Sequence, residues 1–323
     1  MEKLRIIFMG TPDFAVASLE ALVEHEYNIV GVITAPDKPA GRGRKLNESA
    51  VKHYAKSKGL HVMQPTNLKA DAFIKELTDL KANLHIVVAF RMLPKLVWEM
   101  PKYGTFNLHA SLLPNYRGAA PINWAIINGE TKTGASTFFI DEKIDTGEMI
   151  LQKEVPIDKN ENAGSLHDKL MSLGSELVLK TVSLISEGPV KTKPQPKGTD
   201  LKTAYKLNKE NCRIDWSMNT SNIYNKIRGL NPFPSAWCYL NNNDDSLNNV
   251  ASSAYFVFVT DDNLCTDSIQ IIVPEIGGPI VSDSVVNILC YGDSTGEIHI
   301  TATGISPFSY SWNGPASFNA PGD

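Results

Sequence analysis

The sequence predicts an α/β protein built on a parallel-rich sheet, and three observations support that fold class. Residues 4–9 form an apolar run that ends in a Gly-Thr-Pro turn, and a helical pattern and a second apolar run, residues 28–34, follow. This β–α–β order is typical of parallel strands joined by a right-handed crossover. Residues 84–90 are almost continuously apolar, as expected of a strand buried on both faces. With 323 residues, 42% of them apolar, the chain can form two domains with a sizeable core.

The remaining elements follow from periodicity and from turn residues. Helices are predicted over residues 14–26, 51–58, 69–80, 121–128 and 165–187, with Ser165 as the N-cap of the last one. Strands are predicted up to His109 and over residues 135–141 and 148–155. Residues 35–46 hold two prolines and two glycines, so we expect an exposed loop without regular structure there. No glycine-rich dinucleotide or phosphate-loop signature follows the first strand.

Charge is divided unevenly along the chain. Every lysine and arginine lies at or before Arg228, so residues 1–240 hold 31 basic and 25 acidic residues, whereas residues 241–323 hold ten acidic residues and no basic one. The four cysteines have no spacing suited to zinc, and no metal is expected. The N-terminus lacks the features of a signal peptide, and no apolar run approaches the ~20 residues of a membrane-spanning helix, so a cytoplasmic protein is expected.

The candidate site consists of Asn107, His109 and Asp145. Side chains alternate along a strand, so Asn107 and His109 should point to the same side of the sheet, close to the strand's carboxyl end, where α/β proteins build sites. Asp145 precedes a Thr-Gly turn and is the natural group to orient or charge that imidazole. Each residue also has a structural interpretation: a single histidine often only forms a hydrogen bond, and an aspartate before Thr-Gly often only forms a turn. From the residues alone, both interpretations stay open.

Three motifs then resemble the folate-dependent formyltransferase family, and more narrowly its branch that acts on methionyl-tRNA. They are Asn-Leu-His-Ala-Ser-Leu-Leu-Pro over residues 107–114, Tyr-Arg-Gly-Ala-Ala-Pro-Ile over 116–122, and Ile-Asp-Thr-Gly-Glu-Met-Ile over 144–150. The resemblance covers about residues 1–240. It implies a Rossmann-like domain that transfers the formyl group of 10-formyltetrahydrofolate to the amine of methionine on initiator tRNA.

The resemblance also implies roles for individual residues. Asn107 and His109 would donate hydrogen bonds to the oxyanion that develops during acyl transfer, and Asp145 would orient His109 and relay the proton. The loop residues Ser111, Leu112, Leu113 and Pro114 would line the folate site. Ser111 is not expected to be a nucleophile, because it does not lie in a G-x-S-x-G motif.

A basic segment near the N-terminus is a candidate contact with nucleic acid. Between Asp37 and Lys58 there are seven basic and two acidic residues. Such a run is usually a solvated face, but the glycines around Arg42 would let the backbone approach a ligand closely. In the family that the chain resembles, the matching loop enters the acceptor end of the tRNA, and Arg42 falls on the arginine that does so. The candidate tRNA-binding residues are Lys38, Arg42, Arg44 and Lys45.

The expected organisation has four parts. A catalytic domain over residues 1–188 is followed by a Pro- and Lys-rich linker over 189–208 and by the start of an OB-like tRNA-binding barrel over 209–240. Residues 241–323 form a divergent acidic tail with short β-prone runs, such as residues 255–260 and 269–273. This tail resembles fragments of bacterial surface β-sandwich repeats.

Three alternatives remain open on the sequence. The same catalytic core could formylate another amine, glycinamide ribonucleotide or an amino sugar. The tail alone would suggest a non-enzymatic surface or adhesion protein. The catalytic domain could also fold beside a broken barrel that cannot hold tRNA. We expect a monomer that binds folate and initiator methionyl-tRNA and does not bind a membrane.

Overall fold

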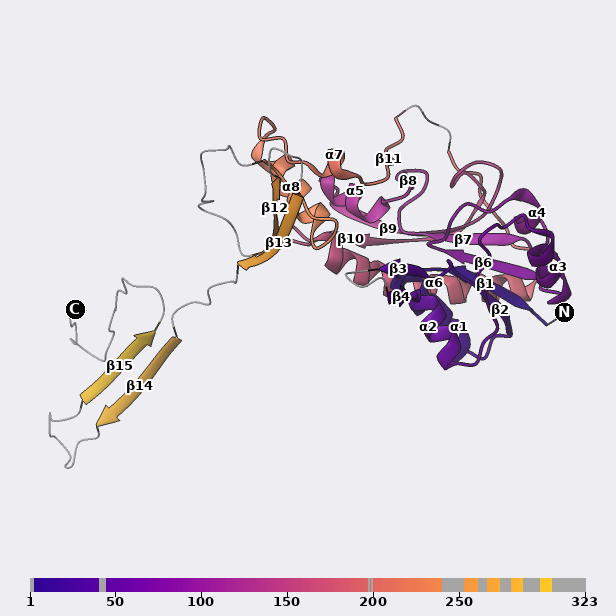
Figure 1. Ribbon diagram of the computed structural model, residues 1–323, viewed down its shortest axis with the longest axis horizontal. Helices are drawn as coiled ribbons and strands as arrows, with labels where there is room; N and C mark the ends of the chain where they lie inside the picture. Colours follow the sequence, from indigo (N-terminus) through magenta and orange to yellow (C-terminus); the bar gives the residue numbers. More distant parts are fainter. Residues whose placement is uncertain are drawn as a thin grey trace. The chain divides into compact units, whose positions relative to one another are not determined.

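The computed structural model describes residues 3–40, 45–196, 198, 200–239, 253–260, 266–273, 280–286 and 297–303. The chain divides into two compact units, Met1–Tyr239 and Leu240–Asp323. The first unit contains a seven-stranded sheet with helices on both faces (Figure 1). The predicted α/β fold class is therefore confirmed.

The sheet is mostly parallel. Its strands, in spatial order, are β10 (Met149–Pro156), β9 (Lys132–Phe139), β7 (Thr105–His109), β6 (Leu84–Val88), β1 (Ile6–Gly10), β2 (Ile29–Ile33) and β5 (Val62–Met63). The five strands from β7 to β5 run parallel, whereas β9 is antiparallel to both β7 and β10. Strand β6 lies in the middle of this order and is buried along its whole length, which explains its continuous apolar run.

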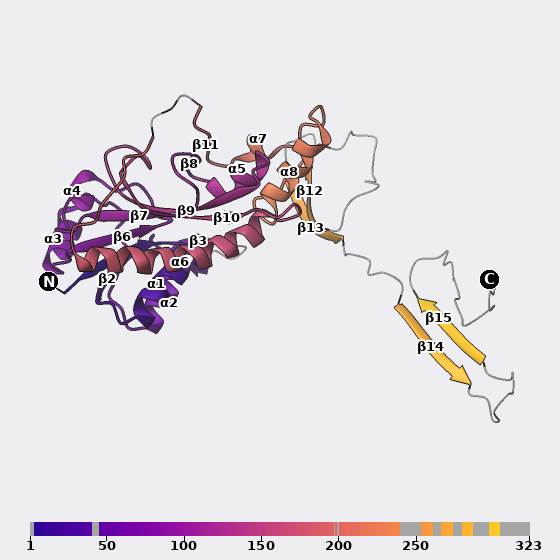
Figure 2. The same ribbon diagram turned by 180° about the vertical axis from the view of Figure 1, so that it is seen from behind.

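Two apolar cores lie on the two faces of this sheet. The helices of the first unit are α1 (Asp13–Glu24), α2 (Ala50–Ser57), α3 (Asp71–Asp79), α4 (Lys95–Trp98), α5 (Pro121–Ile127), α6 (Ala163–Glu187), α7 (Lys209–Cys212) and α8 (Thr220–Leu230). The larger core packs α1, α2 and α6 against one face, where α6 runs along the length of the sheet (Figure 2), and it also includes buried side chains of α5. The smaller core packs α3 and α4 against the other face.

Helix α6 begins earlier than the sequence pattern suggests. Asn162 is its N-cap: its side chain accepts a hydrogen bond from the Ser165 backbone N–H at 2.9 Å, and the Ser165 hydroxyl accepts one from the Asn162 N–H at 3.2 Å. The prediction that Ser165 caps the helix is wrong. Serine is instead the third helical residue of a reciprocal capping box, in which Asn162 provides the stronger capping geometry.

The segment expected to be an irregular loop contains a β-hairpin. Strand β3 (Lys38–Ala40) pairs antiparallel with β4 (Lys45–Asn47). The expectation that two prolines and two glycines exclude a regular element here is therefore wrong. Both strands of a two-stranded hairpin have an open edge, where the missing N–H of a proline leaves no ladder hydrogen bond unmade.

The segment after α6 returns to the catalytic domain instead of leaving it. Strand β11 (Thr203–Ala204) pairs in parallel with β8 (Arg117–Gly118). Helix α8 then docks on α5, where the Asn123 side-chain amide donates to the Gly229 carbonyl oxygen at 2.8 Å. These contacts tie the beginning of the C-terminal region to the sheet domain.

The described residues of the second unit form two antiparallel hairpins. One joins β12 (Ser253–Thr260) to β13 (Thr266–Val273), and the other joins β14 (Ile280–Val286) to β15 (Glu297–Thr303). The β-prone runs predicted over residues 255–260 and 269–273 fall within β12 and β13. Among the described residues of the whole chain, none of the helices has the length and apolar character needed to span a membrane.

A buried histidine sits at the start of the central strand β6. His85 is fully buried, and neither of its ring nitrogens has a hydrogen-bond partner among the described residues. Burial lowers the pKa of His85 to about 4, and the nearby Val97 backbone raises it by a smaller amount. The ring is therefore neutral in the folded protein at neutral pH.

This burial should make the protein acid-sensitive. The pKa of an unfolded histidine is about 6.5, so between that pH and pH ~4 the unfolded chain binds more protons. The free energy of unfolding is therefore not lowered by His85 above pH ~6.5, and the protonation of His85 in the unfolded chain lowers it by up to about 3 kcal/mol as the pH drops to ~4. Urea unfolding of His85→Leu should show a smaller loss between pH 7.5 and pH 5 than the parent chain. Replacement of the exposed His53 by Ala is the control, and an equal loss in His85→Leu would contradict this account.

Candidate active site

His109 ends strand β7 and is held from both sides. Its Nε2 lies 2.7 Å from the carbonyl oxygen of Tyr116, and only 6% of the residue is exposed. A carbonyl oxygen can only accept a hydrogen bond, so Nε2 carries the hydrogen in this pair. The other ring nitrogen, Nδ1, is therefore the one left for proton exchange.

Asp145 reaches His109 from a loop that starts at the far end of the neighbouring strand. Phe139 at the end of β9 pairs with Phe106 near the start of β7, so the loop after β9 must fold back over the sheet to meet His109. There the Asp145 Oδ2 lies 3.8 Å from His109 Nδ1 and accepts a hydrogen bond from the Gly118 N–H at 2.9 Å. The structure places these two side chains next to each other, as the prediction that Asp145 orients His109 requires.

Asn107 lies two residues before His109, on the same face of β7 by strand alternation. It is half-buried and pairs with Val87 of the neighbouring strand β6. Its Oδ1 is buried and has no hydrogen-bond partner among the described residues. Such an unsatisfied amide requires an explanation, and a bound substrate with a hydrogen-bond donor would supply one.

The loop over residues 111–114 is fixed by hydrogen bonds to the neighbouring backbone and to strand β9. The Ser111 hydroxyl donates to the Asn115 carbonyl oxygen at 2.7 Å, and the Leu113 N–H donates to the Ser136 hydroxyl at 3.2 Å. Ser111 and Leu113 are buried, whereas Leu112 and Pro114 are only half-buried. Of the four residues expected to line the folate site, Leu112 and Pro114 therefore have side-chain surface to offer a ligand.

The basic hairpin is anchored at its base. The Asp37 carboxylate accepts hydrogen bonds from Lys52 at 2.5 Å and from Gln64 at 2.7 Å, and these two bonds hold the pKa of Asp37 below its ordinary value. Lys38 is exposed at the start of β3, and Lys45 begins β4. Arg42 and Arg44 lie outside the described residues.

Sequence reasoning missed three residues that shape this site: Arg117, Gly118 and Gln195. The Gln195 side-chain amide donates to the carbonyl oxygens of Asp145 and Gly147, and its Oε1 accepts from Arg117. Arg117 and Gly118 lie inside a motif that was recognised, so their position could have been suspected. Gln195 lies in the Pro- and Lys-rich linker, where no sequence signal distinguishes it.

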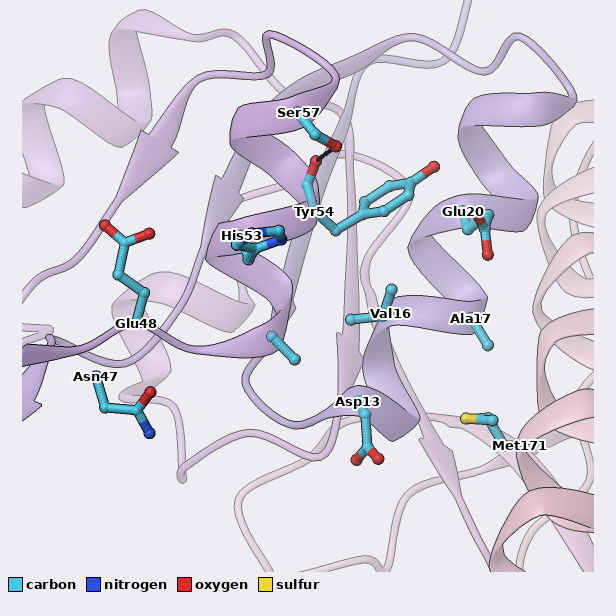
Figure 3. A pocket seen from close by; sticks show the side chains of 11 residues that line it. Asp13, Val16, Ala17, Glu20, Asn47, Glu48, His53, Tyr54, Ser57 and Met171 are labelled. Carbon is cyan, nitrogen blue, oxygen red and sulfur yellow. Dashed lines mark hydrogen bonds between the residues drawn. The ribbon is translucent and has the colours of Figure 1, made fainter. Parts of the chain in front are cut away.

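A groove between α1 and α2 is separate from this site (Figure 3). The Tyr54 ring points from α2 toward α1, and the carboxylates of Asp13, Glu20 and Glu48 lie along the groove. None of the candidate catalytic residues or the residues of the 111–114 loop lines it. Its negative charge makes it a poor surface for a polyanion.

The fold and site define an α/β group-transfer enzyme that places an imidazole and a carboxylate together on a parallel-rich sheet. The chain belongs to the formyl transferase family, which matches residues 3–182, and the C-terminal domain of formyl transferases matches residues 206–252. The family resemblance seen in the sequence is thereby confirmed. An SprB repeat matches residues 282–317, in agreement with the likeness of the tail to surface repeats.

Relatives with high identity carry one name. A methionyl-tRNA formyltransferase of Flavobacterium johnsoniae is 64% identical over 247 residues, which cover 76% of this chain and 78% of that protein. A methionyl-tRNA formyltransferase of Bacteroides fragilis is 57% identical over 244 residues, 75% of each chain. Among solved structures, an N-formyltransferase of Helicobacter canadensis with folinic acid and dTDP-3-aminofucose matches with a TM-score of 0.53 and 24% identity over 70% of this chain and 80% of that one. This last likeness concerns the fold.

Gly118 should tolerate no side chain. Its φ of 121° is a conformation that favours glycine, and an added Cβ would lie 2.4 Å from the Ala204 carbonyl oxygen. We expect Gly118→Ala to lower the free energy of unfolding by roughly 1–3 kcal/mol and to separate β8 from β11. Gly59→Ala is the matched control in chemical denaturation, because Gly59 has a φ of 66° and an added Cβ would meet nothing within 4 Å. Equal losses in the two variants would contradict the steric argument.

Proposed function

We propose that this chain transfers the formyl group of 10-formyltetrahydrofolate to the amino group of methionyl-initiator tRNA. The single observation that carries the proposal is the pairing of His109 with Asp145 at 3.8 Å, both within motifs of the family. The names of the relatives from Flavobacterium and Bacteroides support the choice of amine.

The chemistry assigns a task to each of the three polar side chains. The amine nitrogen bonds to the formyl carbon, the bond from that carbon to N10 of the folate breaks, and one proton passes from the amine to N10. Asn107, whose Oδ1 has no partner among the described residues, accepts an N–H of the amine or donates to the formyl oxygen as negative charge grows there. His109 exchanges the proton through Nδ1, and Asp145 stabilises the positive charge on the ring.

The folate supplies the formyl group, and the residues present are compatible with it. Leu112 and Pro114 offer apolar surface beside the catalytic strand. Met92 and Ile144 are 70% and 58% exposed, and they lie on two segments that the Lys95–Glu142 ion pair joins at 2.8 Å. Exposed apolar side chains on neighbouring loops suit the flat ring of a pterin. No metal is assigned a role in this proposal.

For the tRNA, we assign the basic hairpin Lys38–Asn47 to the acceptor end. Its base is braced by the Asp37–Lys52 pair and by a second ion pair of Lys52 with Glu48 at 3.0 Å. Bracing at the base of the hairpin lowers the conformational entropy that this segment would lose on binding tRNA. We place the reaction in the cytoplasm, where charged initiator tRNA is made, and propose that the enzyme works as a monomer.

The test is a direct comparison of amines. The full chain should formylate methionyl-initiator tRNA much faster than glycinamide ribonucleotide or an amino sugar, with 10-formyltetrahydrofolate as donor. His109→Ala and Asp145→Ala should each lower kcat by roughly 10²-fold or more, while circular dichroism and thermal unfolding stay close to those of the parent chain. Near-normal turnover in either variant would remove that residue from the mechanism. Preference for another amine, or failure to formylate any, would refute the substrate assignment.

The basic hairpin gives a second prediction. Arg42→Ala should raise the KM for charged tRNA, while kcat changes little. It should also reduce the slope of log KM against log salt concentration by about 1, the value expected for the loss of one phosphate contact. Lys75→Ala removes the same charge from the exposed side of α3 and serves as control. Unchanged tRNA kinetics in Arg42→Ala would mean that the hairpin does not contact the tRNA.

A further inference from the structure

The linker after α6 forms a strap across the loops of the catalytic site. Lys193 and Met149 exchange two backbone hydrogen bonds, of 2.8 and 2.9 Å. Further along the linker, the Lys202 carbonyl oxygen accepts from the Tyr116 N–H and the Ala204 carbonyl oxygen accepts from the Ala119 N–H. The strap thus holds both the segment that orients His109 and the segment that follows Asp145.

Gln195 lies between these two anchor points and is itself buried, with 8% of its surface exposed. Its Nε2 donates to the Asp145 carbonyl oxygen at 3.0 Å and to the Gly147 carbonyl oxygen at 2.8 Å. Its Oε1 accepts from Nε and Nη2 of Arg117, at 3.1 and 2.6 Å. Arginine can only donate and carbonyl oxygens can only accept, so the orientation of the amide is fixed by its partners.

The backbone of Asp145 needs such a partner. Its φ is 53°, in the left-handed region, which aspartate enters more readily than most residues with a Cβ and which local hydrogen bonds stabilise. In this conformation the carboxylate turns toward His109 and the Gly118 N–H. A donor that binds the carbonyl oxygens of both Asp145 and Gly147 favours this turn over other conformations of the segment.

We propose that Gln195 is a positioning residue for formyl transfer, which keeps the Asp145 carboxylate aimed at His109 and links it to the Arg117 segment. This inference rests on the proposed function for its effect on turnover. It differs from a purely structural role because its effect passes through one carboxylate. The linker would then connect the C-terminal region to the catalytic pair instead of only separating two domains.

The kinetic test is a double-mutant cycle. Gln195→Ala should lower kcat by roughly ten- to a hundredfold with little change in either KM, because misplacement of a catalytic group of the order of 1 Å has that effect. In an Asp145→Asn background the same change should lower kcat by no more than about twofold, because the carboxylate that Gln195 aims is already absent. A full, additive loss in that background would overturn the proposal.

A conservative variant separates the two halves of the amide. Gln195→Glu keeps an acceptor for Arg117 but places a carboxylate oxygen against the carbonyl oxygens of Asp145 and Gly147. It should therefore lose kcat at least as severely as Gln195→Ala. Recovery of kcat in Gln195→Glu would show that only the contact with Arg117 matters, and would overturn the proposal.

A readout without substrate keeps the test independent of the proposed function. The Gly118 N–H donates to the Asp145 carboxylate, so its hydrogen exchange reports whether that carboxylate is in place. Exchange at Gly118 should accelerate in Gln195→Ala and in Asp145→Ala. Asn83→Ala is the matched control: Asn83 is a buried amide with two backbone partners, Arg5 N–H and Lys3 carbonyl oxygen, and it lies just before β6. It should leave Gly118 exchange and kcat unchanged, and unaltered exchange in Gln195→Ala would refute the inference.

Discussion

The geometry of the catalytic pair depends on two backbone groups that lie two residues apart. The Tyr116 carbonyl oxygen fixes Nε2 of His109, and the Gly118 N–H fixes the carboxylate of Asp145. Because one short segment orients both partners, any displacement of that segment moves the imidazole and the carboxylate together. Both side chains are nearly buried, so their mutual attraction is weakened less by water than it would be at the surface. A side chain at Gly118 would push this segment away from Ala204, and it would therefore displace both catalytic residues.

Strands and helices with a regular apolar period could be predicted from the sequence. Contacts between residues that lie far apart in the chain could not. Strand β6 and helix α1 follow directly from an apolar run and a 3.6-residue period. His109 and Asp145 were predicted because motifs single them out. Gln195 and Arg117 could not be paired from the sequence, since their hydrogen bond joins positions 78 residues apart. The sequence did not predict the hairpin of β3 and β4, because proline cannot donate a ladder hydrogen bond inside a sheet. At the open edge of a two-stranded hairpin no such bond is needed, so proline is tolerated there.

Residues 205–239, at the end of the linker and the start of the C-terminal region, expose several large aromatic side chains. Phe233, Tyr239, Tyr205 and Trp216 are each more than 60% exposed, whereas no aromatic residue of the sheet and its flanking helices is comparably exposed among the described residues. A single exposed aromatic side chain is ordinary, but four within residues 205–239 are a concentration that no other described part of the first unit has. Stacking on nucleic-acid bases is one use of exposed aromatic rings.

The charge distribution decides which part of the chain can supply affinity for a polyanion. Residues 1–240 carry an excess of basic over acidic side chains, and residues 241–323 carry ten acidic ones with none to balance them. Phosphates are repelled by such a tail and attracted by the basic residues of the hairpin and the linker. These forces act over long distances at low salt and are screened beyond about 10 Å at 0.1 M. On charge alone, the first unit is the part of the chain suited to a polyanion. The linker between α6 and α7 bonds both to the segment that orients His109 and to the turn that carries Asp145, so it joins the start of the C-terminal region to the backbone that fixes the catalytic geometry.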